Sequence, residues 1–298
     1  MTPVATTWAD TAAGPALTEH TVDTSLGPIF VQEAGSGTPL VMLHGGGPGA
    51  SGYSNYHQNL AALTPRFRVL LVDQPGFGRS HKPTAEQLRD GEGITGYTVT
   101  ALLEVLDALG IGRAHLLGNS LGGAAALALA QRAPERVERL VLMAPGGGWL
   151  PFGPTPTEGQ KEMFRYFNGS GPSQKKMRTY LRVMLHNAKQ IPEETLEERY
   201  QASLDPEHQD FYHVLNASFA ERRGLDPLWR DLHLVKAPTL LLWGRDDRTI
   251  TLEGAQIMLK QIRDVQLHVF ANCGHWVQLE RRSEFDRLVR DFLEDGDE

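Results

Sequence analysis

The sequence predicts an α/β fold with a mostly parallel central sheet, interrupted by one all-helical segment. Six short runs rich in Val, Leu and Ile each lead into a glycine turn, and helical patterns fall between them. The runs are nearly continuous in apolar residues, which is typical of strands buried on both faces of a parallel sheet. Such alternation of strands and helices favours an open sheet with right-handed crossovers.

The predicted elements follow in chain order. Residues 1–18 lack a strand or helix pattern, so we expect a flexible N-terminal tail. An antiparallel hairpin is predicted next, at 19–23 and 27–33. The buried strands are predicted at 39–43, 68–72, 114–117, 138–143, 238–243 and 265–270. The helices between them are predicted at 97–109, 121–132, 252–262 and 283–292.

The alternation stops between residues 149 and 234. This segment lacks a buried-strand run and contains helical patterns at 158–167, 172–186, 192–203 and 207–222. An inserted helical segment commonly covers the carboxyl edge of a parallel sheet, where ligands bind. We therefore expect an α/β core at 19–148 and 235–298 with a helical lid at 149–234. A separate helical domain without a role in the site is the alternative.

Composition excludes several classes of protein. Lys and Arg number 29 against 36 Asp and Glu, so no overall basic field exists to attract nucleic acid or an anionic membrane. The single cysteine, Cys273, excludes an intrachain disulfide and a cysteine-based zinc cluster. The first Lys or Arg is Arg66, and no apolar run is long enough to span a membrane. We therefore expect a cytoplasmic protein.

A strand-to-helix turn carries the first candidate catalytic residue. The run Gly118-Asn119-Ser120-Leu121-Gly122 follows the third buried strand and opens a strongly helical segment. This is the context of a nucleophile elbow, in which a tight turn requires glycines and projects the serine outward. The alternative is a glycine-rich turn with an incidental serine.

Two later residues complete a candidate catalytic triad with Ser120. A serine hydroxyl becomes nucleophilic when a base takes its proton and a carboxylate orients that base. Asp247 follows the fifth buried strand and His275 the sixth, so both fall at the same sheet edge as Ser120. Asp246 competes for the acid position, but the spacing of three residues after Gly244 favours Asp247. No histidine pattern has metal-ligand spacing, and we expect no metal.

The glycine run His44-Gly45-Gly46-Gly47-Pro48-Gly49 follows the first buried strand. Successive glycines let backbone N–H groups face inward, and we expect the Gly46 and Leu121 amides to stabilise an oxyanion.

The same run overlaps a dinucleotide-binding pattern. Residues 47–52 satisfy G-x-G-x-x-G, and Asp73 ends the next strand, where a dinucleotide fold places its ribose-binding acid. However, Pro48 removes an N–H donor from the turn, and a dehydrogenase has no use for the predicted triad. The sequence therefore favours a hydrolase over an oxidoreductase.

Several longer motifs support a narrower interpretation. They are His44-Gly-Gly-Gly-Pro-Gly-Ala50, Ser54-Asn55-Tyr56, Asp73-Gln-Pro-Gly-Phe-Gly-Arg-Ser80, Gly118-Asn-Ser-Leu-Gly-Gly123, Trp243-Gly-Arg-Asp-Asp-Arg248 and Cys273-Gly-His-Trp276. Together they resemble the meta-cleavage product hydrolases, carbon–carbon bond hydrolases of aromatic and steroid ring degradation with the α/β-hydrolase fold. The resemblance covers nearly the whole chain from about Thr21. Its most selective features are Asn119 before the serine and Trp276 after the histidine.

The resemblance implies a substrate class and a set of substrate contacts. The family cleaves 2-hydroxy-6-oxohexa-2,4-dienoates to a 2-hydroxypenta-2,4-dienoate and a carboxylic acid, after ketonisation of the dienol and without a cofactor. Arg199, in the helical segment, matches the family's carboxylate-binding arginine, and arginine suits bidentate contact with a carboxylate. The other matching contacts are Gly46, Gly47, Asn55, Asn119 and Trp276.

One segment departs from the family pattern. Where the family often has Tyr-Asp and a small polar residue, this chain reads His186-Asn187-Ala188-Lys189. Lys189 either supplies a second cation to the substrate or points to water. The resemblance also implies a homodimer or homotetramer. It leaves open whether the substituent at C6 is methyl, alkyl, phenyl or steroid-derived. The alternatives are a carboxylesterase of the same fold and a small-molecule receptor that retains the triad.

Overall fold

The computed structural model describes residues 14–148, 155–187, 191–222 and 226–294. In this part of the chain, one sheet has the strand order β1-β2-β4-β3-β5-β6-β7-β8. The pairs β1–β2 and β2–β4 are antiparallel and the remaining pairs are parallel, which confirms the predicted fold class. The strands are β1 Thr18–Thr24, β2 Gly27–Ala34, β3 Thr38–Leu43, β4 Phe67–Val72, β5 Ala114–Asn119, β6 Val137–Met143, β7 Thr239–Gly244 and β8 Val265–Phe270.

Helices cover both faces of the sheet, which is why the inner strands β3 to β7 are mainly apolar, whereas the edge strands β1 and β8 contain polar residues and are only partly buried. Alternate residues of β3 enter two different hydrophobic clusters: Val41 and Leu43 in one, Leu40 and Met42 in the other. The first cluster includes side chains of α4, α5 and α10, and the second those of α1, α2 and α12. The helices outside the segment between β6 and β7 are α1 Gly52–Tyr56, α2 Leu60–Leu63, α3 Ala85–Asp90, α4 Gly93–Ala108, α5 Leu121–Arg132, α10 Ala255–Gln261, α11 Val277–Glu280 and α12 Arg282–Glu294.

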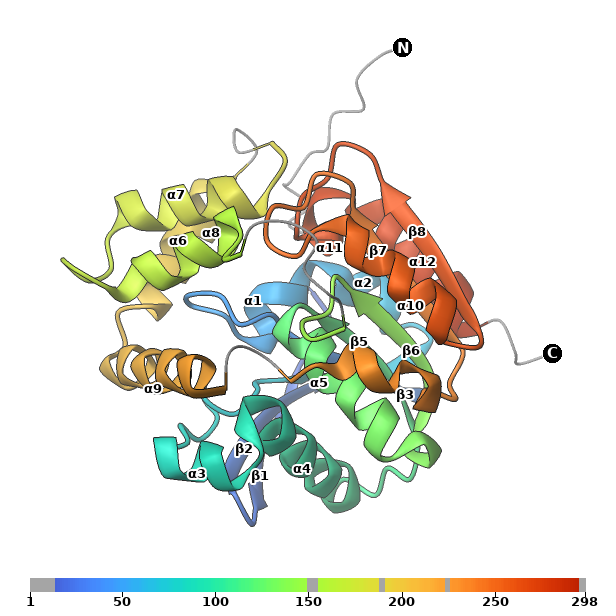
Figure 1. The fold of residues 1–298 in the computed structure, drawn as a ribbon. Helices are drawn as coiled ribbons and strands as arrows, with labels where there is room; N and C mark the ends of the chain where they lie inside the picture. Colours follow the sequence, from blue (N-terminus) through green and yellow to red (C-terminus); the bar gives the residue numbers. More distant parts are fainter. Residues whose placement is uncertain (1–13, 149–154, 188–190, 223–225, 295–298) are drawn as a thin grey trace.

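Between β6 and β7, the described residues form helices and no strand. They are α6 Glu158–Phe167, α7 Gln174–Met184, α8 Glu193–Ala202 and α9 Pro206–Arg222, which we call the helical insertion. Figure 1 shows them gathered on one side of the molecule, near α1. A third hydrophobic cluster joins insertion side chains such as Tyr180 to Leu121 and Trp276, which directly follow Ser120 and His275. The insertion therefore packs against the carboxyl edge of the sheet.

The start of α6 is fixed by hydrogen bonds both within the helix and to the core. Thr157 and Gln160 form a capping box, in which each side chain accepts a hydrogen bond from the other residue's backbone N–H. The Thr157 hydroxyl also donates to the Thr249 carbonyl oxygen, 2.8 Å away in the loop after β7. This cap therefore ties the insertion to the loop that carries Asp247.

Several predicted boundaries differ from the structure. The first strand begins at Thr18, inside the predicted tail, whose residues 1–13 lie outside the described part of the chain. The predicted helix at 252–262 is a short 3-10 turn followed by α10. The short helices α1, α2 and α3 were not predicted, because helices of four to six residues show little periodicity. The described helices include none that is both long and apolar enough to span a membrane.

Candidate active site

Ser120 occupies the sharp turn between β5 and α5. Its backbone adopts φ 55° and ψ −113°, an unfavourable conformation for a residue with a side chain. The Ser120 N–H donates to the Met143 carbonyl oxygen at 2.9 Å, which ties the turn to the end of β6. A Cβ at Gly118 would clash with the Gly122 backbone, so the turn requires glycine there. The sequence thus forms the predicted nucleophile elbow by close backbone packing.

Asp247 and His275 form a buried pair at the same edge of the sheet. His275 Nδ1 lies 2.7 Å from Asp247 Oδ2, and both residues are almost fully buried. The other carboxylate oxygen accepts hydrogen bonds from the Thr249 and Ile250 amides at 2.7 and 3.0 Å. These donors fix the carboxylate, and the carboxylate in turn orients the imidazole.

Asp246, the competing acid, points elsewhere. Its carboxylate is partly exposed and lies 3.0 Å from His186 Nδ1 and 3.3 Å from Arg245 Nε. Among the described residues, the carboxylate that pairs with His275 is that of Asp247.

Ser120 and His275 line one small pocket of about 10 Å³, which we call the polar pocket. No hydrogen bond joins Ser120 Oγ to His275 in the described structure. In ligand-free enzymes this contact is often loose and tightens when substrate binds. The same pocket is lined by all the described residues that the family resemblance implied as substrate contacts. They are Gly46, Gly47, Asn55, Asn119, Arg199 and Trp276. Lys189 lies outside the described residues.

Arg199 of α8 supplies a buried positive charge to the polar pocket. The residue is 3% exposed, and burial lowers the pKa of its guanidinium from the ordinary value. Nη2 donates to Asn55 Oδ1 at 2.5 Å, and Cζ lies 4.4 Å from the centre of the Trp276 ring. Among the described residues no carboxylate forms an ion pair with Arg199, and its buried Nε has no hydrogen-bond partner. A buried cation without an anion is costly, so the pocket is suited to a ligand carboxylate.

Asn119 connects the nucleophile strand to the histidine loop. Its Nδ2 lies 3.3 Å from the Met143 carbonyl oxygen and 3.5 Å from that of His275. Its Oδ1 is buried without a hydrogen-bond partner. Because buried polar atoms are normally paired, this oxygen provides an acceptor for a ligand hydroxyl.

The glycine loop after β3 lies against the start of α5. A Cβ on Gly46 would be 2.9 Å from the Leu121 side chain, so the loop packs directly against the first residue of α5. Leu121 begins α5, and the N–H of a first helical residue has no acceptor within its helix. The loop is held by His44, whose Nδ1 lies 2.8 Å from the Gly45 carbonyl oxygen and whose Nε2 accepts from the Gln74 amide. Burial lowers the pKa of His44 to about 3, so this imidazole is neutral.

Comparison with known proteins identifies the family. Residues 38–282 match the family model described as alpha/beta hydrolase fold. A 2-hydroxy-6-oxo-6-phenylhexa-2,4-dienoate hydrolase of Comamonas testosteroni is 42% identical over 89% of this chain and 91% of its own length. A 2-hydroxy-6-oxononadienedioate/2-hydroxy-6-oxononatrienedioate hydrolase of Pseudomonas sp. is 40% identical over 90% and 92%. The solved meta-cleavage product hydrolase of Pseudomonas fluorescens IP01 superposes with a TM-score of 0.81 at 30% identity, over 93% of this chain and 98% of its own.

The chain belongs to the meta-cleavage product hydrolases. It is therefore a serine-dependent hydrolase of the α/β-hydrolase fold.

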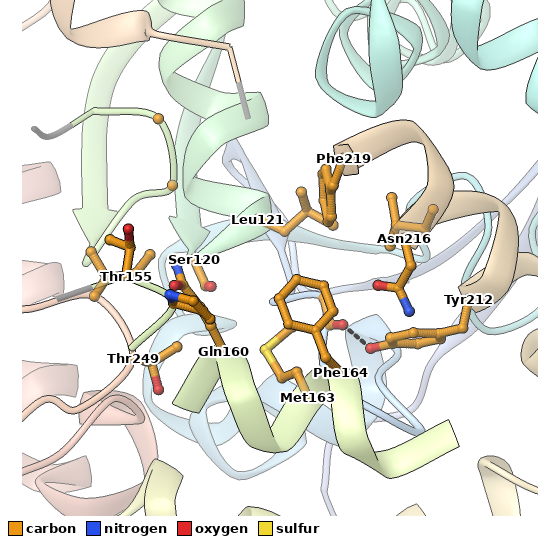
Figure 2. Close-up of a pocket in the computed structure, with 16 residues that line it drawn as sticks. Ser120, Leu121, Thr155, Gln160, Met163, Phe164, Tyr212, Asn216, Phe219 and Thr249 are labelled. Atoms are coloured by element: carbon orange, nitrogen blue, oxygen red, sulfur yellow. Dashed lines mark hydrogen bonds between the residues drawn. The ribbon is translucent and has the colours of Figure 1, made fainter. Parts of the chain in front are cut away.

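A second and larger cavity opens from the nucleophile of this hydrolase. It has a volume of about 380 Å³, and we call it the distal cavity. Gly46, Ser120 and Met163 line both this cavity and the polar pocket. Figure 2 shows side chains of α6 and α9 around it, with Tyr212 donating a hydrogen bond to the Gly46 carbonyl oxygen. Ser120 thus lies at the junction between a polar and a mainly apolar space.

The structure adds site residues that the sequence interpretation missed. Tyr180 and Met184 of α7 line the polar pocket of this hydrolase. Burial raises the pKa of Tyr180 to about 12, so its hydroxyl is a neutral donor, and it has no hydrogen-bond partner among the described residues. The spacing of Met177, Tyr180, Leu181 and Met184 indicates the buried face of a helix. That signal identifies the face but not the pocket that it meets.

Proposed function

We propose that the protein hydrolyses a carbon–carbon bond in ring-fission products of the 2-hydroxy-6-oxohexa-2,4-dienoate type, formed in aromatic or steroid catabolism. One observation carries this proposal: the buried guanidinium of Arg199 has no carboxylate partner among the residues that the structure describes, and it lies in the same pocket as Ser120 and His275. An esterase for neutral substrates gains nothing from such a cation, whereas a dienoate brings the carboxylate that it lacks.

The polar pocket would hold the dienoate half of the substrate after its side chains move apart, because its volume of about 10 Å³ without ligand has room for about one water molecule. Arg199 binds the carboxylate, and Asn55 keeps the guanidinium in place through its hydrogen bond. The free oxygen of Asn119 accepts a hydrogen bond from the 2-hydroxyl group, while the Tyr180 hydroxyl donates one to a substrate oxygen. This placement brings the C6 carbonyl to Ser120, where the two pockets meet.

The chemistry begins with a proton transfer that converts the dienol to its keto tautomer, for which His275 is the shuttle. Ser120 Oγ then attacks C6 as His275 takes its proton, and the Gly46 and Leu121 amides stabilise the oxyanion. The bond between C5 and C6 breaks, and its electron pair is delocalised through the C3–C4 double bond onto the 2-oxo oxygen. That oxygen receives a proton, which releases 2-hydroxypenta-2,4-dienoate. Water activated by His275 then hydrolyses the acyl-serine and releases the carboxylic acid.

The proposal extends to features beyond the reacting groups. Residues 149–234 act as a lid that excludes water from the site, the chain requires no metal or organic cofactor, and the enzyme works in the cytoplasm as a homodimer or homotetramer. Light scattering of the purified protein measures the oligomeric state, and a monomer at micromolar concentration would contradict that part of the proposal.

Substitution of Arg199 tests the proposed function. We expect Arg199→Ala to lower kcat/KM for a dienoate by about 100- to 1000-fold, because a bidentate bond between charged groups contributes about 3–4 kcal/mol. The assay is loss of the visible absorbance of the dienol. Arg199→Lys, which keeps the charge but not the fork geometry, should recover part of this loss.

A neutral ester serves as the control substrate in the same experiment. Its slow hydrolysis by the wild-type protein should be nearly unaffected by Arg199→Ala, because the ester has no carboxylate to bind. An enzyme that hydrolyses neutral esters rapidly and bleaches no dienoate would be a carboxylesterase, and the proposal would be wrong.

A further inference from the structure

The lining and volume of the distal cavity indicate the charge and size of the C6 substituent, which the sequence leaves open. Its described lining is mainly apolar, with Met163, Phe164 and Leu215 among the contributing side chains. The polar side chains are neutral ones, including Gln160, Asn216 and Thr249. No Asp, Glu, Lys, Arg or His is among the described residues that line it.

Sequence similarity does not decide between two kinds of substituent. The relative named for a 6-phenyl substrate is 42% identical to this chain, and the relative named for dioate substrates is 40% identical. A dioate has a second carboxylate, and that group would have to enter the distal cavity, since the first is bound by Arg199. The lining of the cavity is therefore the discriminating feature.

Charge argues against a second carboxylate. Within the described lining of the distal cavity, the side chains able to donate a hydrogen bond to a second carboxylate are neutral amides and hydroxyls. No cation is among these lining residues. Transfer of a carboxylate from water to such a site without a partner is strongly unfavourable. The distal cavity therefore selects a neutral substituent.

Size argues for a substituent larger than a single phenyl ring. A cavity of about 150 Å³ suffices to bind benzene. The distal cavity, at about 380 Å³, is more than twice as large. A lone phenyl or methyl group would leave much of this space without contacts and would forfeit the corresponding burial of apolar surface.

Two amides add a further chemical preference. Figure 2 shows the side chains of Gln160 and Asn216 among those that surround the cavity, on opposite helices α6 and α9. The Gln160 oxygen is used in the capping box of α6, which leaves its NH₂ group free to donate. Neither the side-chain oxygen nor the NH₂ group of Asn216 has a hydrogen-bond partner among the described residues. A hydroxyl or carbonyl on the substituent would pair with these groups.

We propose that the natural substrate carries at C6 a neutral group larger than a phenyl ring, an inference that rests on the proposed function. Examples are a fused bicyclic group and an oxygen-substituted aryl or alicyclic group. The dienoate half binds as in any substrate of this site. The distal cavity then selects the acyl half by its size and lack of charge.

A panel of dienoates with different C6 groups tests this inference by loss of visible absorbance. Bicyclic and hydroxyphenyl substrates should have kcat/KM equal to or above that of the phenyl substrate. The methyl substrate should be about tenfold lower or worse, and the dioate about 100-fold lower. Dioate turnover equal to that of phenyl, or bicyclic turnover tenfold below phenyl, would overturn the inference.

A pair of variants isolates the effect of charge. Asn216→Lys introduces a cation at the distal cavity, and Asn216→Leu removes the same amide without adding charge. We expect the lysine variant to raise kcat/KM for the dioate at least about tenfold over the leucine variant. Equal dioate activity of the two variants would show that charge is not what excludes the dioate.

The panel also separates this inference from the proposed function. If no member of the panel is bleached by the wild-type protein, the proposed function itself is wrong. If the dienoates are bleached but the dioate is a substrate as good as the neutral compounds, only the substrate class is wrong.

Discussion

Ser120, the nucleophile, has a strained backbone conformation with a positive φ. A positive φ carries a steric penalty for alanine or serine but not for glycine. We therefore expect Ser120→Gly to have a free energy of unfolding about 1 kcal/mol higher than Ser120→Ala, even after the entropic cost of glycine in the unfolded chain. Urea denaturation of the two variants measures the difference. A glycine variant no more stable than the alanine variant would contradict a strained elbow.

Tyr180 provides a second test at the residue scale. Its buried, neutral hydroxyl lies in the polar pocket without a hydrogen-bond partner in the described part of the chain. Tyr180→Phe should therefore lower kcat/KM for a dienoate about tenfold, through loss of one hydrogen bond to the substrate. Tyr166→Phe is the matched control, because its hydroxyl lies 2.6 Å from Ser203 Oγ and does not line the pocket. Equal effects of the two substitutions on dienoate turnover would contradict the role of Tyr180.

Sequence and structure contribute differently to these residues. Ser120, Asp247 and His275 are predictable because each follows a buried strand directly, and strand ends lie at one edge of a parallel sheet. Arg199 was suggested only by the family resemblance, since on its own it resembles a solvated helix charge. Tyr180 was missed because its position depends on how α7 packs on the core, which the local sequence does not specify.

At the scale of elements, the contact between α12 and the 3-10 turn before α2 contains a titratable group. Asp286 of α12 accepts a 2.7 Å hydrogen bond from Asn59, and burial raises the pKa of its carboxyl from 3.8 to about 7, with only partial relief from Arg282 and Arg290. A carboxyl whose pKa is higher in the folded state binds more protons when folded than when unfolded. The free energy of unfolding should therefore fall as pH rises from about 4 to about 7.

Asp286→Asn tests this dependence. The amide keeps the oxygen that accepts from Asn59 but cannot ionise, so the variant should be more stable than wild type above pH 7, by roughly 1–3 kcal/mol. Below about pH 4 the two proteins should be nearly equal in stability. Urea denaturation over this pH range measures the difference. Parallel profiles for the two proteins would contradict a raised pKa at Asp286.

The accuracy of the predicted elements follows from how each is stabilised. Strands β3 to β7 differ from their expected bounds by one or two residues, because burial on both faces demands nearly uninterrupted apolar runs. Strand β8 has the expected bounds although it is only partly buried. Helix α6 also has the expected bounds, since Thr157 and Gln160 give a clear capping signal. By contrast, α1 and α2 are held by contacts with the sheet, and their sequences show no helical period.

At the scale of the whole molecule, the site is formed by segments that are distant in the sequence. Its acid, base and nucleophile come from three different strand ends, and its cation comes from the helical insertion. The positions of the strands in the sequence predict that the acid, base and nucleophile come together. The position of the Arg199 cation depends on the third hydrophobic cluster, which packs the insertion against Leu121 and Trp276. The size of the distal cavity follows from that packing and could not be predicted from the sequence.

Product analysis in isotopically labelled water tests the central claim most directly. If the site cleaves a carbon–carbon bond through an acyl-serine, a dienoate will yield equal amounts of 2-hydroxypenta-2,4-dienoate and a carboxylic acid. Mass spectrometry should find labelled oxygen in the acid and none in the dienoate product. An intact carbon skeleton, or labelled oxygen in the pentadienoate instead of the acid, would contradict the account.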